Sequence, residues 1–158
     1  MKAIFAGTFD PFTIGHRDIV ERAARLFDGV IVAVAVDTGK PAAPLKVRTE
    51  IAKSAVKDLS NVTVESFCGL LTDFAKEKGY CVLIRGVRNC ADLDYERDLT
   101  NVYKSMSGIE SLIIISSPEL SHVSSSVVRT AAALGGDISK FVVKGTVQKI
   151  AEIYGKKR

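Results

Sequence analysis

The N-terminal segment places a strand, a glycine-bounded loop and a helix in succession, and this order constrains the fold more than any other feature. The apolar run Ala3–Ala6 predicts a buried strand, and apolar residues between Ile19 and Phe27 recur at helical spacing. Glycines near both ends of the intervening loop, Gly7–His16, let backbone approach a ligand closely. His16 falls near the helix start, where unpaired N–H groups and the helix dipole favour an anion. The unit therefore predicts a phosphate site rather than an ordinary turn.

The rest of the chain repeats this alternation. Strands are predicted at Lys2–Ala6, Val30–Val36, Val62–Ser66, Cys81–Ile84 and Ser111–Ile115, and helices at Gly15–Phe27, Val47–Leu59, Leu70–Lys78, Leu93–Met106, Ser125–Leu134 and Thr146–Tyr154. Repeated strand–helix units with near-continuous apolar strands are typical of a parallel sheet covered on both faces. We therefore predict an α/β fold with a doubly wound, five-stranded parallel sheet. No linker or repeat interrupts residues 1–158, so we predict one domain.

Composition narrows the class of ligand. A net charge of +4 and a pI near 9.0 suit an anion. Nucleic acid is not expected, because the basic residues are scattered and only residues 156–158 form a run. The longest apolar run, Val30–Val36, is too short to span a bilayer, and no signal peptide is recognisable, so we expect no membrane association.

The cysteines predict no metal or redox site. Cys68, Cys81 and Cys90 are odd in number and show no C-x-x-C spacing, and the chain contains only two histidines to complete a zinc site. We expect reduced structural thiols in a cytoplasmic protein.

Ligands of doubly wound sheets bind beyond the carboxyl ends of the strands, at a topological switch point. Here each predicted strand is followed by a polar or glycine-containing segment: Gly7–His16, residues 37–40, residues 68–71, Arg85–Arg88 and residues 117–126. We expect these segments to bring four cations to one edge of the sheet, where they would suit a triphosphate: Lys40, Arg85, Arg88 and Arg129.

Several of these residues also have ordinary structural interpretations. Arg85–Arg88 could be a buried strand ending in a basic turn, and Lys40 could be a solvated loop residue. Ser124–Ser126 could be an N-cap cluster, which is compatible with gripping phosphate. We interpret Asp92 as an acidic residue at a helix N-terminus, stabilised by the helix dipole. For Glu96, a role in binding a ligand stays open. His122 is interpreted as a structural or solvent-facing residue.

Four motifs together resemble bacterial phosphopantetheine adenylyltransferases of the nucleotidylyltransferase superfamily. They are Gly7-Thr8-Phe9-Asp10-Pro11 with Thr13-x-Gly15-His16, Leu83-Ile84-Arg85-Gly86-Val87-Arg88, Asp94-Tyr95-Glu96, and Val123-Ser124-Ser125-Ser126-Val127-Val128-Arg129. The last resembles the superfamily pattern Ile-Ser-Ser-Thr-x-x-Arg, with valine for isoleucine and serine for threonine. The similarity runs almost from end to end and agrees in order and spacing.

The resemblance implies a Rossmann-like fold and transfer of the adenylyl group of ATP to 4′-phosphopantetheine, giving dephospho-coenzyme A and pyrophosphate. It also implies Mg²⁺ with ATP, a cytoplasmic location and a homohexamer. Position by position, it implies His16 as the catalytic residue. It implies ATP contacts from Thr8, Phe9, His16, Gly86, Val87, Arg88, Glu96, Leu120, Ser121, His122, Val123, Ser124, Ser125 and Ser126, and contacts to the second substrate from Thr8, Lys40, Leu71 and Arg85.

The chain departs from the family pattern at a few positions. Ile14 stands where many relatives have asparagine, Thr130 where they often have an acid, and Val143 where proline is usual. The loop after Lys40 is one residue short, which leaves Lys46 as a substitute for the substrate lysine.

Other functions remain open on the residues alone. Other nucleotidylyltransferases of the superfamily act on nicotinate mononucleotide or glycerol phosphate, but Arg85–Arg88 with residues 94–96 favours phosphopantetheine. A non-catalytic nucleotide-binding protein would need the glycine loop and the arginines but not His16. A thiol-based redox module lacks any C-x-x-C.

Overall fold

The computed structural model describes residues 1–36, 39, 42–80 and 82–155. Its strands are β1 (Lys2–Gly7), β2 (Gly29–Ala35), β3 (Val62–Phe67), β4 (Val82–Val87) and β5 (Glu110–Ile115). Its helices are α1 (Ile14–Ala24), α2 (Leu45–Ala55), α3 (Leu71–Glu77), α4 (Cys90–Ser107), α5 (Ser125–Ala133) and α6 (Val147–Tyr154), with 3₁₀ turns at Pro118–Leu120 and Lys144–Thr146. Every predicted strand and helix is therefore confirmed, with small differences at the ends.

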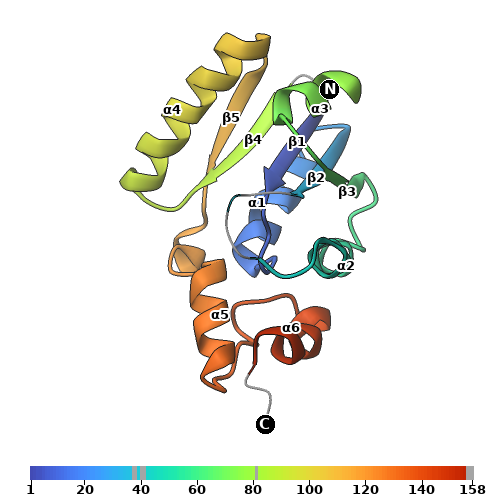
Figure 1. Ribbon diagram of the computed structural model, residues 1–158. Coiled ribbons are helices and arrows are strands. Elements are labelled where there is room, and N and C mark those ends of the chain that lie inside the picture. The colour runs from blue at the N-terminus through green and yellow to red at the C-terminus, as the bar shows by residue number, and fades with distance from the viewer. Residues whose placement is uncertain (37–38, 40–41, 81, 156–158) are drawn as a thin grey trace.

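The strands form one parallel sheet in the order β3-β2-β1-β4-β5. The order reverses between β1 and β4, so the switch point lies at the carboxyl end of β1, where the glycine-bounded loop begins. Helices cover both faces, and α5 and α6 lie below the carboxyl ends of the strands (Figure 1). The predicted doubly wound fold is confirmed.

Alternate residues of the central strands pack into two separate hydrophobic cores, one on each face of the sheet. On one face, Phe5, Val32 and Ile84 pack with buried residues of α1, α2, α5 and α6. On the other face, Ile4 and Leu83 belong to a smaller cluster with residues of α3. The larger core fixes the loops at the carboxyl edge, because α1, α5 and α6 all pack into it.

Two boundaries differ from the prediction in ways that matter for function. Strand β4 continues to Val87, because Arg85 and Gly86 remain in register with Ile113 and Ile114 of β5. Arg85, Gly86 and Val87 therefore lie within the strand, and the prediction that they follow it is wrong. Helix α4 begins before the predicted Leu93, because the Asn89 side chain caps it by accepting the Asp92 N–H at 2.9 Å.

The expectations about membrane association, metal binding and the cysteines concern the chain outside the predicted site. In the described ranges, no helix is long and apolar enough to cross a membrane. Among the same residues, no group of three or more His, Cys, Asp or Glu side chains is placed to hold a metal ion. Cys68 and Cys90 are free and exposed rather than packed as structural thiols, and Cys81 lies outside the described residues.

Candidate functional site

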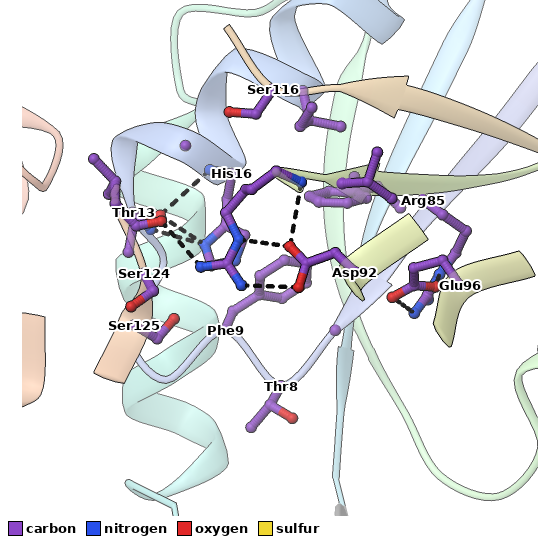
Figure 2. Close-up of a pocket in the computed structure, with 18 of the residues that line it drawn as sticks. Thr8, Phe9, Thr13, His16, Arg85, Asp92, Glu96, Ser116, Ser124 and Ser125 are labelled. Carbon is purple, nitrogen blue, oxygen red and sulfur yellow. Dashed lines mark hydrogen bonds and ion pairs between the residues drawn. The ribbon is translucent and has the colours of Figure 1, made fainter. Parts of the chain in front are cut away.

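A cavity of about 410 Å³ lies at the carboxyl edge of the sheet, beside the switch point. Its walls come from β1 and the loop after it, from α1, from β4 with the start of α4, and from the start of α5. In Figure 2, Thr13, Ser124 and Ser125 lie on one side of the cavity, and Arg85 and Glu96 lie on the other. The cavity therefore gathers segments that are far apart in the sequence.

Three helices contribute residues of their first turns to this cavity. The start of α1 contributes Gly15 and His16, the first turn of α4 contributes Asp92, and α5 contributes its N-cap Ser124 and the next two serines. Ser124 caps α5 by accepting the Val127 N–H at 3.2 Å. The dipoles of three helix starts favour a ligand with several negative charges.

The loop after β1 is shaped by one aromatic side chain. Phe9 is buried although its backbone has a φ of 49°, in the left-handed region. A Cβ at Gly7 would lie 3.1 Å from the Phe9 ring, so a side chain there would press on the ring, and glycine leaves it undisturbed. The Phe9 ring in turn meets His16 edge to face, with centroids 5.1 Å apart. Gly7 thus serves the placement of His16 as well as the approach of a ligand.

His16 is held by a reciprocal cap at the start of α1. The Thr13 hydroxyl accepts the His16 N–H at 3.3 Å, and the Thr13 N–H donates to His16 Nδ1 at 3.0 Å. An imidazole nitrogen that accepts a hydrogen bond carries no proton, so the neutral ring carries its proton on Nε2. In the described part of the chain no protein acceptor is found for Nε2, and the ring lines the cavity. His16 therefore offers a free N–H donor to a ligand.

His16 is neutral at physiological pH. Burial among Phe5, Phe9 and Phe12 penalises the imidazolium, and the nearby Arg88 charge adds to this effect, so the pKa falls from 6.5 to about 4. A neutral imidazole with its proton on Nε2 can act as a hydrogen-bond donor, whereas the imidazolium that a general acid requires is disfavoured here.

We predict that an NMR titration of the His16 ring gives a midpoint near pH 4. Because this pKa lies below that of the unfolded chain, the stability linked to neutral His16 is complete above about pH 6.5 and is lost as the pH falls toward 4. Urea unfolding at about pH 7 and pH 5 should therefore show a larger loss of stability for the wild type than for His16→Gln. A midpoint near 6.5 would contradict the neutral-donor assignment.

Arg88 is oriented by Asp92, one turn further along. Its Nε donates to Asp92 Oδ2 at 2.9 Å, Nη2 donates to Oδ1 at 3.3 Å, and its backbone N–H donates to Oδ2 at 3.2 Å. Nη1 also donates to the Val123 carbonyl at 3.4 Å, so the guanidinium connects the starts of α4 and α5. Both side chains remain partly exposed to the cavity.

Arg85 forms a second, more buried ion pair with Glu96. Two guanidinium nitrogens, Nε and Nη2, donate to the two oxygens of the carboxylate, and the side chains are only 15% and 14% exposed. Together with Arg88 and Asp92, the cavity holds two cations and two carboxylates. The arginines are thus pre-oriented, and an incoming polyanion competes with carboxylates for them.

Most residues expected at the site line this cavity. They are Thr8, Phe9, His16, Arg85, Gly86, Val87, Arg88, Glu96, Val123, Ser124, Ser125 and Ser126. Leu71 does not line it, since it starts α3 and packs beside Phe74 and Ala75. Leu120, Ser121 and His122 lie in the turn before α5, outside the lining, and the exposed His122 ring meets Phe141 edge to face. Lys40 lies outside the described residues.

One expected cation faces elsewhere. Arg129 does not line the cavity, because its Nη1 donates to the Asp10 carbonyl and lies 3.7 Å from the Asp10 carboxylate. The prediction that Arg129 gathers with the other cations at the ligand edge is therefore wrong. The position of Arg129 in the sequence, three residues after the serine cluster, does not reveal the direction of its side chain.

The cavity also contains residues that were not singled out as ligand contacts. Thr13 and Asp92 could have been identified from the sequence, since Thr-x-x-His can form a capping pair and Asp92 precedes Glu96 by one helical turn. Tyr95 shares that helix face. Ser116 carries no such signal: it enters the lining because its N–H donates to the Val87 carbonyl at 2.8 Å and extends the pairing of β5 with β4.

Comparison with known proteins agrees with this geometry. The cytidylyltransferase-like family model matches residues 4–131. The phosphopantetheine adenylyltransferase of Cutibacterium acnes is 46% identical over 143 residues, which cover 90% of this chain and 91% of the relative. A crystal structure from Vibrio parahaemolyticus, provisionally assigned as a nicotinate-nucleotide adenylyltransferase, matches with a TM-score of 0.69 at 17% identity over 97% of both chains. At that identity, the structural match supports the fold alone.

Proposed function

Because the chain belongs to the cytidylyltransferase-like family, we propose that it transfers the adenylyl group of ATP to 4′-phosphopantetheine, giving dephospho-coenzyme A and pyrophosphate. The observation that carries the proposal is the free Nε2–H of His16 in a cavity that three helix N-termini and two arginines surround. The identity to a phosphopantetheine adenylyltransferase over 90% of the chain supports the choice of acceptor. The test is pyrophosphate release from ATP with different phosphate acceptors.

The reaction needs no nucleophile from the protein. A phosphate oxygen of the acceptor is already ionised and attacks the α-phosphorus of ATP, while the bond from that phosphorus to the bridging oxygen breaks and pyrophosphate leaves. The protein contributes position and charge stabilisation. His16 Nε2 would donate to a non-bridging α-phosphate oxygen, whose charge and geometry change most when the phosphorus becomes five-coordinate.

The proposed contacts divide the cavity between the two substrates. Thr8, Phe9 and His16, the segment Gly86–Arg88, Glu96 and residues 123–126 would hold ATP, with N–H groups at the start of α5 available to its phosphates. The family resemblance adds residues 120–122, which lie in the turn just before this lining. Arg85, on the opposite side from Ser124, would hold 4′-phosphopantetheine (Figure 2). The family resemblance adds Lys40, outside the described residues, and Leu71, which lies outside the cavity lining.

We propose that Mg²⁺ enters with ATP rather than occupying a site of its own. The two carboxylates of the cavity, Asp92 and Glu96, are both paired with arginines. Mg²⁺ commonly binds substrate phosphates and water with few protein ligands, so such a cavity fits a nucleotide-borne ion. When bound, the ion would neutralise charge on the triphosphate.

We also propose a cytoplasmic homo-oligomer, with the hexamer of the family as the expected size. The support is an apolar face on α4 and the edge strand β5. Helix α4 has no buried residue; Val102 and Met106, one turn apart on the same face of α4, are 50% and 52% exposed, and Ile115 at the end of β5 is 68% exposed. Exposed apolar patches of this kind mark protein interfaces. Light scattering of the purified chain measures the number of subunits.

The two arginines should have separable effects on substrate binding. Arg88→Ala is expected to weaken ATP binding about tenfold or more, since a charge-assisted hydrogen bond contributes about 1.5–3 kcal/mol. Arg88→Lys should recover little, because an ammonium cannot reproduce the planar fork that Asp92 orients. Arg85→Ala should mainly raise the dissociation constant of 4′-phosphopantetheine.

Calorimetric titration with each substrate measures these constants. Arg97→Ala is the matched control, because Arg97 lies on exposed α4 surface with Asp94 and Asp98. It should leave both constants unchanged. Unaltered affinities in all the Arg85 and Arg88 variants would remove these arginines from the site.

A further inference from the structure

Asp10 lies outside the cavity, yet its buried carboxylate joins three parts of the chain. Oδ1 accepts the Ala43 N–H at 3.0 Å and also the hydroxyl of Tyr154, from the last turn of α6. Oδ2 lies 3.7 Å from Nη1 of Arg129, which also donates to the Asp10 carbonyl. A buried carboxylate requires such partners, because an unpaired one would be costly to bury. Asp10 therefore depends on groups from the C-terminal third of the chain.

Arg48 of α2 braces the same two loops from the other side. It is 2% exposed and makes its hydrogen bonds to backbone carbonyls. It donates to Thr8 O at 2.6 Å, to Ala43 O at 2.8 Å and to Ala35 O at 3.0 Å, at the end of β2. The loop after β1 and the segment that leads into α2 are thus tied together twice, once through Asp10 and once through Arg48.

These two connections, through Asp10 and Arg48, affect how the two substrates would be placed relative to each other. The loop after β1 carries Thr8 and Phe9 into the cavity, next to His16. Ala43 lies three residues after Lys40, which the proposed function assigns to the acceptor. Two further contacts anchor the first loop to the C-terminal third: the Ser125 hydroxyl donates to Pro11 O at 2.9 Å, and the Ile14 N–H donates to Phe141 O at 3.0 Å.

We propose that Tyr154 is a positioning residue for the transfer reaction, acting through Asp10. Its hydroxyl holds the Asp10 carboxylate where that group fixes the loop after β1 against the segment at Ala43. Helix α6, which contributes no residue to the cavity, is thereby part of the apparatus that aligns acceptor and α-phosphate. The inference rests on the proposed function, because the effect of Tyr154 is measured on that reaction. Misplacement of reacting groups by about 1 Å can cost about a hundredfold in rate, so a modest loosening should be visible.

The test compares Tyr154→Phe with Tyr103→Phe. Both changes remove only a hydroxyl, but Tyr103 packs on the opposite face of the sheet, against the smaller core. Tyr154→Phe is expected to lower kcat about tenfold, with the KM for ATP within about threefold of the wild type, since alignment rather than binding is impaired. Tyr103→Phe should change neither. Melting temperatures of both variants separate an effect on turnover from lost stability.

A double-variant cycle tests whether Tyr154 acts through Asp10. In an Asp10→Ala background, Tyr154→Phe should have no further effect on kcat, because coupled residues are not additive. Should Asp10→Ala fail to fold, Asp10→Asn replaces it, and the added effect of Tyr154→Phe should then shrink to about threefold or less.

Amide hydrogen exchange provides a readout that is independent of activity. Exchange in peptides covering residues 8–14 and 42–44 should rise in Tyr154→Phe and stay unchanged in Tyr103→Phe. A wild-type protein that releases no pyrophosphate with 4′-phosphopantetheine would overturn the proposed function, while the exchange comparison would still decide the positioning role. That role is overturned if Tyr154→Phe leaves kcat within twofold, if it acts additively with Asp10→Ala, or if exchange in both segments is unchanged.

Discussion

Replacing His16 with alanine is expected to lower kcat about 10²–10³-fold, the usual effect of removing one preorganised donor to a developing oxyanion. The Nε2–H is free and directed by the Thr13 cap at Nδ1, so no reorganisation is needed when charge builds on the α-phosphate. The contact should strengthen toward the transition state, so the dissociation constant of ATP should rise far less than kcat falls.

The same variant separates the catalytic interpretation from a structural one. His16 also caps α1 with Thr13, and loss of a cap costs about 1 kcal/mol of stability. If capping were its only role, the folded fraction of His16→Ala would turn over normally. Measuring kcat, ATP affinity and melting temperature on one preparation decides this. A folded variant within about threefold of the wild-type kcat would refute the catalytic assignment.

Replacing Arg48 with methionine is expected to destabilise the protein by about 3–5 kcal/mol, because each buried carbonyl left without a donor costs about 1–3 kcal/mol. Methionine preserves much of the volume but leaves the carbonyls of Thr8, Ala35 and Ala43 without their donor. For a chain of this size, that corresponds to a fall in melting temperature of roughly 10 °C.

Thermal unfolding of Arg48→Met measures this effect directly. Arg25→Ala is the control, because Arg25 is exposed and pairs with Glu21 at 2.9 Å on the surface of α1, where an ion pair contributes at most about 1 kcal/mol. The bracing role of Arg48 would be wrong if its variant melted within about 3 °C of the Arg25 control.

The sheet could be predicted from sequence because apolar periodicity and turn residues are local signals. Each β-rich run became a strand, and the parallel arrangement followed from the helices between them. The end of β4 was not predictable in the same way. Arg85 and Gly86 resemble the start of a loop, but their backbone pairs with β5, and Gly86 fits because a Cβ there would lie 3.1 Å from Ile19.

The site was predictable where residue order and spacing carry the information. The glycine loop, His16 and the serine cluster all reach one cavity because they follow parallel strands or begin helices at one edge. The directions of the side chains were harder to predict. Arg129 turns to Asp10, and the pairing of Arg85 and Arg88 with carboxylates depends on the start of α4, which only the packed structure fixes.

Buried polar networks were the part of the structure that was hardest to predict from the sequence. Arg48 lies in a helical pattern that reads as an ordinary amphipathic segment, and its acceptors lie in β2 and two loops. Tyr154 and Asp10 are 144 residues apart in sequence. No local pattern marks such pairs, because their geometry is created by the docking of α2 and α6.

The measurement that tests the central claim most directly is pyrophosphate release from ATP and Mg²⁺ with one of three acceptors. They are 4′-phosphopantetheine, nicotinate mononucleotide and glycerol phosphate. We expect dephospho-coenzyme A and pyrophosphate in equal amounts with the first, and kcat/KM at least about a hundredfold lower with the others, since buried polar groups reject ligands that leave them unpaired. No adenylylated protein should accumulate, because the acceptor attacks the α-phosphorus itself. Comparable turnover with nicotinate mononucleotide, or isolation of a covalent AMP–protein intermediate, would contradict the account.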